Sequence, residues 1–257
     1  MTLHARIARR FDRAAAHYDA DSAPQRHAAE QLTQRIIAAG LPPAPRVLEI
    51  GCGTGHLTQS LLHRLPSVDF CASDIAPAMV AACRQRLPGI RYLVMDGQQP
   101  AVCGSFDLIC ANLAAQWFGD LPAALRRWTA LLAPGGMLAF SMLGNDTFHE
   151  WRAAHQTLGL RAGTPAFPRT HDVTAMFPPG KLSLTEEHYI DHPSSALGFL
   201  HQLRAIGADT AASTHQPLGA GQLRKVLRQL GDAPTASYHL IYLAYRPEIY
   251  AHAQTRE

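Results

Sequence analysis

The chain has 257 residues, of which 47% are hydrophobic and 17% are charged, and its formal net charge is +3. This composition excludes a disordered chain, and so small a net charge gives no indication of nucleic acid as a partner. No stretch approaches the roughly 18 continuous apolar residues of a membrane-spanning helix, and the length suits one large α/β domain.

The cysteines and histidines predict neither a disulfide framework nor a metal site. The five cysteines are odd in number and none belongs to a C-x-x-C pair: Cys52, Cys71, Cys83, Cys103 and Cys110. His149 and His155 are six residues apart on an expected helix, so they do not share a face, and no H-E-x-x-H motif accompanies them. The first residues contain no apolar signal segment, and we expect a cytoplasmic protein.

Residues 3–39 predict two helices. Apolar residues recur at i, i+4, i+7 and i+11, which is one stripe of a helix: Ile7, Phe11, Ala14 and Tyr18. The segment Asp21–Pro24 can end this helix and start a second one that runs to Gly40. A proline-rich linker over 41–45 follows, because proline lacks the backbone N–H that would extend the helix.

From residue 46 onward, apolar strands alternate with helices. Strands are expected over 46–50, 68–73, 90–95, 106–111, 137–143, 181–190 and 238–245. Helices are expected over 57–65, 77–87, 121–132, 146–158, 195–206 and 219–230, with a proline-rich loop over 163–180. Near-continuous apolar strands separated by helices are typical of a parallel sheet covered on both faces. We therefore predict a Rossmann-like α/β fold with a mostly parallel sheet of seven strands.

The first of these strands runs directly into a glycine-rich turn. Its sequence is Glu49-x-Gly51-x-Gly53-x-Gly55. Glycines let the backbone pass close under a ligand, and the helix that follows presents free N–H groups. The dinucleotide pattern G-x-G-x-x-G does not fit, because His56 or Thr58 would stand at its last position. The turn resembles the first motif of class I S-adenosylmethionine-dependent methyltransferases, and the resemblance implies that Glu49 lies near the cationic end of that cofactor.

Further residues stand where such a cofactor needs partners. Asp74 ends the second strand and can accept hydrogen bonds from both ribose hydroxyls. Asp96-Gly97 ends the third strand, where a carboxylate can accept from the adenine amino group, and Asn112-Leu113 ends the fourth strand at the reaction centre. Ile75 and Met79 would form an apolar bed for the adenosine, with core packing as the alternative. A single Asp could simply cap a helix, but the ordered set predicts S-adenosylmethionine.

Segments near both ends and in the middle of the chain indicate which group of methyltransferases the chain resembles. They are Phe11–Asp19 with Gln25-Arg26, Asn112–Trp117, Leu203–Ala208 and Tyr238–Leu240. These segments resemble the malonyl-(acyl-carrier-protein) O-methyltransferases of biotin biosynthesis. The resemblance implies methyl transfer to the free carboxylate of a malonyl thioester on acyl carrier protein or coenzyme A. The methyl ester would then prime pimeloyl synthesis. Neither nucleic acid nor membrane is expected as a partner, and we expect a monomer or weak dimer.

This reaction implies positioning residues and no general base, because a carboxylate is already ionised near neutral pH. Arg204 is the candidate cation for the malonyl carboxylate; the family usually has Lys there, and a surface Arg is the alternative. Tyr18, with His17, would close over the cofactor, although Tyr18 could equally end the apolar stripe. Trp117 would wall the acceptor channel or pack in the core. An adjacent basic stripe could dock an acidic carrier protein or simply face solvent: Arg6, Arg10, Arg13 and His17.

One segment leaves another function open. Leu143–Arg152 also resembles complex I assembly factors that keep the methyltransferase fold and hydroxylate a protein arginine. A methyltransferase of another small carboxylic acid and a non-catalytic cofactor-binding regulator are further alternatives. In each case we expect one domain over 1–257. It would contain a helical cap over 1–40, a cofactor-binding core over 46–143, and insertions over 145–180 and 191–235 that form an acceptor lid.

Overall fold

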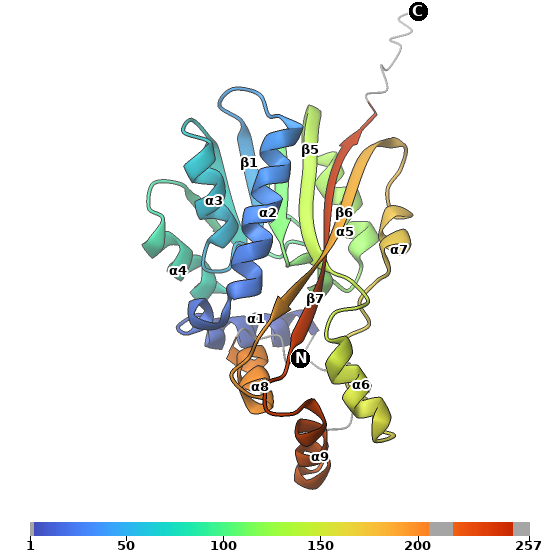
Figure 1. Ribbon diagram of the computed structural model, residues 1–257. Coiled ribbons are helices and arrows are strands. Elements are labelled where there is room, and N and C mark those ends of the chain that lie inside the picture. Colours follow the sequence, from blue (N-terminus) through green and yellow to red (C-terminus); the bar gives the residue numbers. More distant parts are fainter. Residues whose placement is uncertain (1–2, 206–217, 249–257) are drawn as a thin grey trace, which may run out of the picture.

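A computed structural model of the chain describes residues 3–205 and 218–248 (Figure 1). Its strands are β1 (Arg46–Ile50), β2 (Asp69–Asp74), β3 (Arg91–Val94), β4 (Phe106–Asn112), β5 (Leu132–Leu143), β6 (Gly180–Asp191) and β7 (Ala236–Pro247). They form one seven-stranded sheet in the order β3-β2-β1-β4-β5-β7-β6. Only β7 pairs antiparallel with its neighbours, β5 and β6. The predicted Rossmann-like sheet is confirmed.

Helices cover both faces of this sheet. They are α1 (Leu3–Ala14), η1 (Tyr18–Asp21), α2 (Ala23–Ala39), α3 (His56–Arg64), α4 (Pro77–Arg86), η2 (Ala115–Trp117), α5 (Leu121–Ala130), α6 (His149–Thr157), α7 (Thr170–Thr174), α8 (Ala196–Ala205) and α9 (Ala220–Leu230). Leu32 of α2 and Leu57 of α3 belong to one buried hydrophobic cluster, and Trp128 of α5 belongs to a second. The central strands are continuously apolar because both of their faces are buried. None of the helices in the described ranges is long and apolar enough to cross a membrane.

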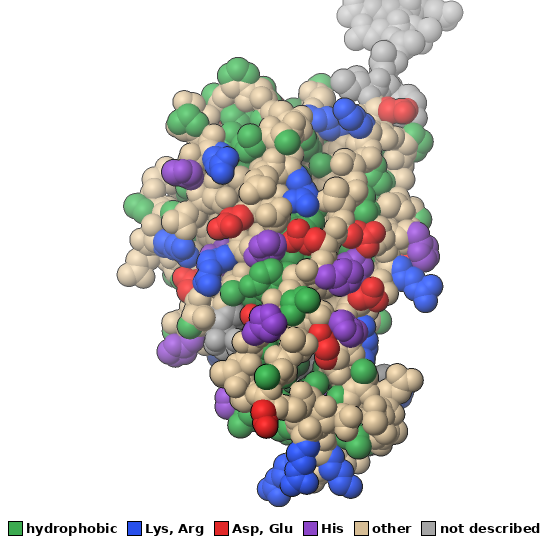
Figure 2. All heavy atoms as spheres, in the orientation of Figure 1, with side chains coloured by type: hydrophobic (Ala, Val, Ile, Leu, Met, Phe, Trp, Pro, Cys, Tyr) green, Lys and Arg blue, Asp and Glu red, His purple; other side chains and the backbone are tan. Residues whose placement is uncertain are grey.

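Two helix ends follow from local sequence. Pro24 stands in the first turn of α2, where its missing N–H costs no hydrogen bond, and Gly40 ends the helix at φ +78°. A contact between side chains also joins α2 to the edge strand β6: His27 Nε2 lies 2.5 Å from Glu187 Oε1. Figure 2 shows histidine and acidic side chains next to one another over this face of the molecule.

Three expected boundaries were wrong. The first helix ends at Ala14 and not at Tyr18. The residues that follow form η1, which is bound to the glycine turn: Asp19 accepts a hydrogen bond from Thr54 at 2.5 Å. β5 begins at Leu132, five residues before the expected start at residue 137, because Leu132 already pairs with Phe106 of β4. The proline-rich loop contains the short helix α7.

The elements place a site at one end of the sheet. Figure 1 shows α1 lying across the carboxyl ends of the parallel strands, with α6, α8 and α9 beyond the same end. The strand order reverses between β1 and β4. Ligands of open α/β sheets bind at such a switch point, outside the carboxyl ends of the strands.

Candidate active site

A cavity of about 680 Å³, including its open mouth, lies at this switch point beneath α1. Most of the predicted site residues line it: Tyr18, Gly51, Gly53, Asp74, Ile75, Met79, Asp96, Gly97, Asn112, Leu113 and Trp117. The structure thus brings together residues from the ends of β1, β2 and β4 and from the loop after β3. Seven further residues complete the lining: Ile7, Phe11, Ile50, Met95, Gln98, Ala114 and Phe118.

The glycine turn forms the floor of the cavity. Gly51 has φ +74°, and a Cβ there would lie 2.5 Å from the Cβ of Ala114, so only glycine fits. Gly53 has φ +53° with open space around its Cβ position. Its N–H donates to Asp74 Oδ2 at 2.9 Å. This geometry keeps the backbone of the turn close to Ala114 and Asp74 and leaves space for a ligand in the cavity.

Asp74 is the central carboxylate of the cavity. It is only 8% exposed, and its other oxygen, Oδ1, accepts from the N–H of Ala76 at 2.8 Å. Burial raises the pKa of Asp74, and the two backbone donors partly offset that effect. A carboxylate has about four acceptor positions, so Asp74 can still accept from ribose hydroxyls in the cavity.

The loop after β3 is held in place by hydrogen bonds at one end of the cavity. The N–H of Gln98 donates to Asp96 Oδ1 at 2.9 Å, and the carbonyl of Gly97 accepts from Trp128 Nε1 at 2.7 Å. A Cβ on Gly97 would lie 2.3 Å from the side chain of Ile50. Apolar side chains of Ile7, Met95 and Phe118 complete this end and suit an aromatic base. The stripe containing Ile7 was recognised in the sequence, but a stripe does not reveal which surface it covers.

The N-terminal elements are fastened over the cavity by polar contacts. Asp12 of α1 accepts from the N–H of Ala78, in the first turn of α4, at 2.9 Å. Asp19 of η1 accepts from Thr54 in the glycine turn and from Arg86 of α4 at 3.1 Å. These bonds hold η1, which begins at Tyr18, against the glycine turn and α4, and Tyr18 lines the cavity.

Tyr18 and Trp117 form an aromatic wall around Phe11. The ring of Phe11 meets Trp117 edge-on at 5.7 Å and lies 6.5 Å from the ring of Tyr18. Burial, followed by the charges of Asp74 and Asp19, raises the pKa of the Tyr18 phenol well above its ordinary value. Tyr18 therefore keeps its proton at neutral pH and can donate a hydrogen bond but not act as a base.

Comparison with known proteins identifies the family. A family model described as a methyltransferase domain matches residues 48–138. A malonyl-(acyl-carrier protein) O-methyltransferase from Magnetococcus marinus is 40% identical over 93% of this chain and 92% of its own length. The chain belongs to this O-methyltransferase family. Such enzymes use S-adenosylmethionine, and the glycine turn, Asp74 and the apolar end of the cavity fit that cofactor.

The chain is also similar to a longer protein and to solved structures of the same fold. The biotin biosynthesis bifunctional protein BioCD of Bordetella avium is 48% identical over 93% of this chain, which spans only 52% of that protein. Among solved structures, the N-methyltransferase NodS of Bradyrhizobium japonicum, in complex with S-adenosylhomocysteine, matches with a TM-score of 0.54. It has 19% identity and the match covers 94% of this chain and 99% of that one. A putative methyltransferase of Bacillus halodurans matches with a TM-score of 0.58 and 14% identity, over 84% and 99% of the two chains. At these identities the structures show the fold alone.

A second, smaller cavity of about 380 Å³ adjoins the first in this O-methyltransferase. The two cavities share four lining residues: Phe11, Tyr18, Leu113 and Trp117. Leu113 has φ +48°, a strained conformation for a non-glycine residue that is typical of functional sites. The rest of the wall comes from Gln25, Gln116, Leu143, Phe148 and Tyr238.

Two amide side chains of this second cavity have unsatisfied oxygens. Oε1 of Gln25 and Oε1 of Gln116 are buried without a hydrogen-bond partner. Nε2 of Gln116 is fixed by donating to the carbonyl of Leu113 at 2.6 Å. Buried polar atoms without partners are rare, and these two oxygens are available to accept hydrogen bonds from a ligand. Both residues belong to the family segments recognised in the sequence, where neither had an expected role.

Glu49 and Gly55 were expected at the cofactor but do not line the cavity. Glu49 is 1% exposed and turns toward α3, where its Oε2 accepts from Thr58 Oγ1 at 2.5 Å. Burial raises the pKa of Glu49 to about 8, and the hydrogen bond from Thr58 partly offsets this effect. Gly55 has φ +97°, and a Cβ there would lie 2.8 Å from Cys83 Sγ, so its role in this structure is packing.

The remaining candidates are Arg204, His17 and the basic stripe of α1. Arg204 stands in α8, but its side chain is outside the described part of the chain. His17 is exposed and lines neither cavity. Arg6 and Arg13 are exposed on α1, as a basic surface stripe requires, and Arg10 is half-buried.

Proposed function

We propose that this chain transfers the methyl group of S-adenosylmethionine to the free carboxylate of a malonyl thioester on acyl carrier protein, giving the methyl ester that primes pimeloyl synthesis. The observation that carries the proposal is the second cavity, which joins the cofactor cavity at shared walls and contains two unsatisfied amides. The near full-length similarity to a malonyl-(acyl-carrier protein) O-methyltransferase supports the choice of acceptor.

When bound, S-adenosylmethionine supplies an electrophilic methyl group on a cationic sulfur. The malonyl carboxylate needs no base, and the protonated Tyr18 could not supply one. The chain's contribution is to position the acceptor and to exclude water with apolar walls, among them Phe11, Trp117 and Phe148. In such surroundings two opposite charges attract each other more strongly than in water.

Asn112 holds the end of β4 and is not free to react. Its Oδ1 accepts from Ser141 Oγ at 2.7 Å, and its Nδ2 donates to the carbonyl of Gln25 at 3.0 Å. These bonds tie β4 to β5 and to α2, and they fix Gln25 beside the second cavity. We assign Asn112 a positioning role.

Gln25 and Gln116 are proposed to bind the acceptor. Because Nε2 of Gln116 is already committed, its Oε1 would accept from an amide N–H of the phosphopantetheine arm. A half-turn of the Gln25 amide would present N–H donors to the malonyl group. Arg204 stays our proposal for the cation that orients the malonyl carboxylate.

The partners and location are proposed from the surface and the cysteines. The exposed Arg6 and Arg13 lie on the helix that covers the cavity, so an acidic carrier protein docked there would deliver its arm to the site. All five cysteines are free, which supports a reducing cytoplasm. We propose a monomer or weak dimer.

Malonyl-carrier protein and methyl-labelled S-adenosylmethionine test the proposal directly. A base-labile methyl ester should form on malonyl-carrier protein and not on acetyl-carrier protein, which has no free carboxylate. Gln116→Leu should raise the KM for malonyl-carrier protein at least about tenfold, since a buried hydrogen bond is lost, and leave the Kd of S-adenosylhomocysteine unchanged. Gln85→Leu, an exposed change on α4, is the control. No ester, or equal labelling of the acetyl form, would refute the proposed acceptor.

A further inference from the structure

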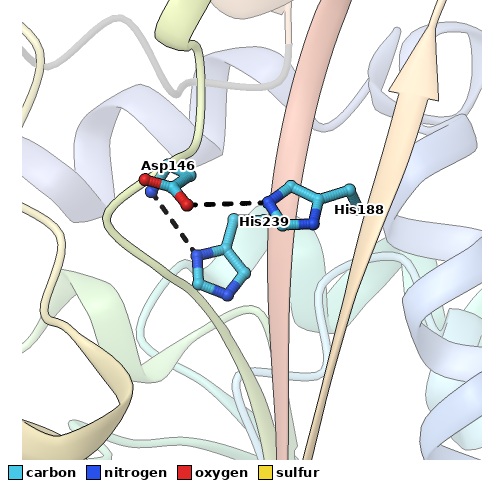
Figure 3. Close-up of side chains that lie close together, drawn as sticks. All are labelled: Asp146, His188 and His239. Carbon is cyan, nitrogen blue, oxygen red and sulfur yellow. Dashed lines mark hydrogen bonds and ion pairs between the residues drawn. The ribbon is translucent and has the colours of Figure 1, made fainter.

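Three side chains of the types that bind metal ions in proteins lie close together outside the two cavities. Asp146 comes from the loop between β5 and α6, His188 from β6 and His239 from β7 (Figure 3). One ligand atom of each lies within 4.8 Å of the others. Neither cysteine pairs nor histidines at helical spacing indicate this cluster, because pairing of β6 with β7 brings His188 and His239 together.

His239 is held in the orientation that a metal ligand requires. Its side chain is only 3% exposed, and its Nε2 lies 2.7 Å from Glu186 Oε2. A carboxylate at Nε2 favours the tautomer with the proton on that nitrogen, which leaves the lone pair on Nδ1. Figure 3 shows Nδ1 directed toward Asp146, whose N–H lies 3.4 Å away, a long contact that an ion could replace.

Gly144 makes the space for this ring. A Cβ at Gly144 would lie 2.4 Å from Nδ1 of His239. Any other residue would therefore push the imidazole away from Asp146. The backbone leading to Asp146 is thus shaped around the nitrogen that would bind the ion.

His188 is the cross-strand partner of His239. The two residues are paired in the β6–β7 register, and their rings stack at 4.9 Å with 14° between the planes. Nε2 of His188 lies 3.7 Å from Asp146 Oδ2. The side chains of His188 and Asp146 are 51% and 53% exposed, so they can rotate toward a common ion while His239 stays fixed.

We propose that Asp146, His188 and His239 bind a divalent transition-metal ion, Zn²⁺ in particular. Two imidazole nitrogens and one carboxylate oxygen suit Zn²⁺, whereas Ca²⁺ and Mg²⁺ prefer oxygen ligands alone. Ligand bonds of about 2.0–2.2 Å require the exposed side chains to close by about 1 Å. The ion would fasten Asp146, at the start of the insertion over 145–180 that is expected to contribute to the acceptor lid, to the paired strands β6 and β7.

Metal binding can be measured without any methyltransferase assay. The full chain, prepared without a polyhistidine tag and freed of metal with a chelator, is titrated with Zn²⁺ by calorimetry. One ion per chain should bind, and the melting temperature should rise by about 5–10 °C when free Zn²⁺ is 100-fold above its Kd. Co²⁺ should give the visible absorption of a nitrogen- and oxygen-coordinated site.

Variants of exposed residues separate this site from adventitious surface binding. His188→Ala and Asp146→Asn should weaken Zn²⁺ binding at least about tenfold, as should Glu186→Gln, which removes the carboxylate that orients His239. His63→Ala, an exposed histidine on α3, is the control and should bind as the wild type does. Absence of Zn²⁺ binding by the wild type, or equal affinity in the wild type and His188→Ala, would overturn the proposal.

Discussion

Replacing Asp74 with asparagine tests the cofactor site at its central residue. The carboxylate accepts from two backbone N–H groups, of Gly53 at 2.9 Å and Ala76 at 2.8 Å, and lines the cavity. An amide has one oxygen where the carboxylate has two, so it would lose at least one ribose bond to a charged acceptor. Such a bond contributes about 1.5–3 kcal/mol, and Asp74→Asn should weaken S-adenosylhomocysteine binding about 10–150-fold.

Isothermal titration with S-adenosylhomocysteine measures this change, and Asp107→Asn provides a matched control. Asp107 is also a strand-end carboxylate that accepts a backbone N–H, from Arg46 at 2.8 Å, but it does not line the cavity. The control should lower the free energy of unfolding by about 1–2 kcal/mol and leave the Kd unchanged within twofold. If Asp74→Asn binds the ligand within threefold of the wild type, Asp74 is not the ribose acceptor.

Three further predictions concern the neighbourhood of the cavity. Burial raises the pKa of Glu49 from its ordinary 4.5 to about 8, so the folded state retains a proton that the unfolded state releases, and stability falls as pH rises through this window. Urea unfolding at pH 5 and pH 8.5 without cofactor should show a smaller loss for Glu49→Gln than for the wild type; equal losses would contradict the shift. Gly51→Ala should cost about 2–4 kcal/mol, from its positive φ and its clash with Ala114, whereas Gly53→Ala should cost about 1–2 kcal/mol. Equal costs in denaturation without cofactor would rule out the clash. Asp12→Ala should cost about 1 kcal/mol and speed S-adenosylhomocysteine dissociation in stopped-flow measurements, because α1 loses its bond to α4; an unchanged rate would show that α1 does not retain the ligand.

The sequence alone determined the order and kind of most elements. The alternation of strands and helices was clear in the sequence, because the central strands are buried on both faces and therefore consist of continuous apolar residues. The glycine turn and Asp74 could be predicted to meet at one site because a strand, a tight turn and a helix follow one another directly in the chain. Local spacing was sufficient for these features.

Features that depend on long-range contacts could not be read in this way. The stripe of Ile7 and Phe11 gave a helix but not its place over the cavity, which bonds from Asp12 to α4 and from Asp19 to the glycine turn decide. Glu49 has the right position in the motif, yet Thr58 of α3 turns its carboxyl away.

The second cavity and the histidine cluster depend on tertiary structure still more strongly. Gln25 and Gln116 are 91 residues apart, and they meet only because α2 and η2 both pack at the end of β4. His188 and His239 become neighbours only through the register of β6 and β7. The spacing of apolar residues reflects the helix or strand in which they lie. The surface that a side chain contacts depends on how distant elements pack, and this packing forms the proposed acceptor and metal sites.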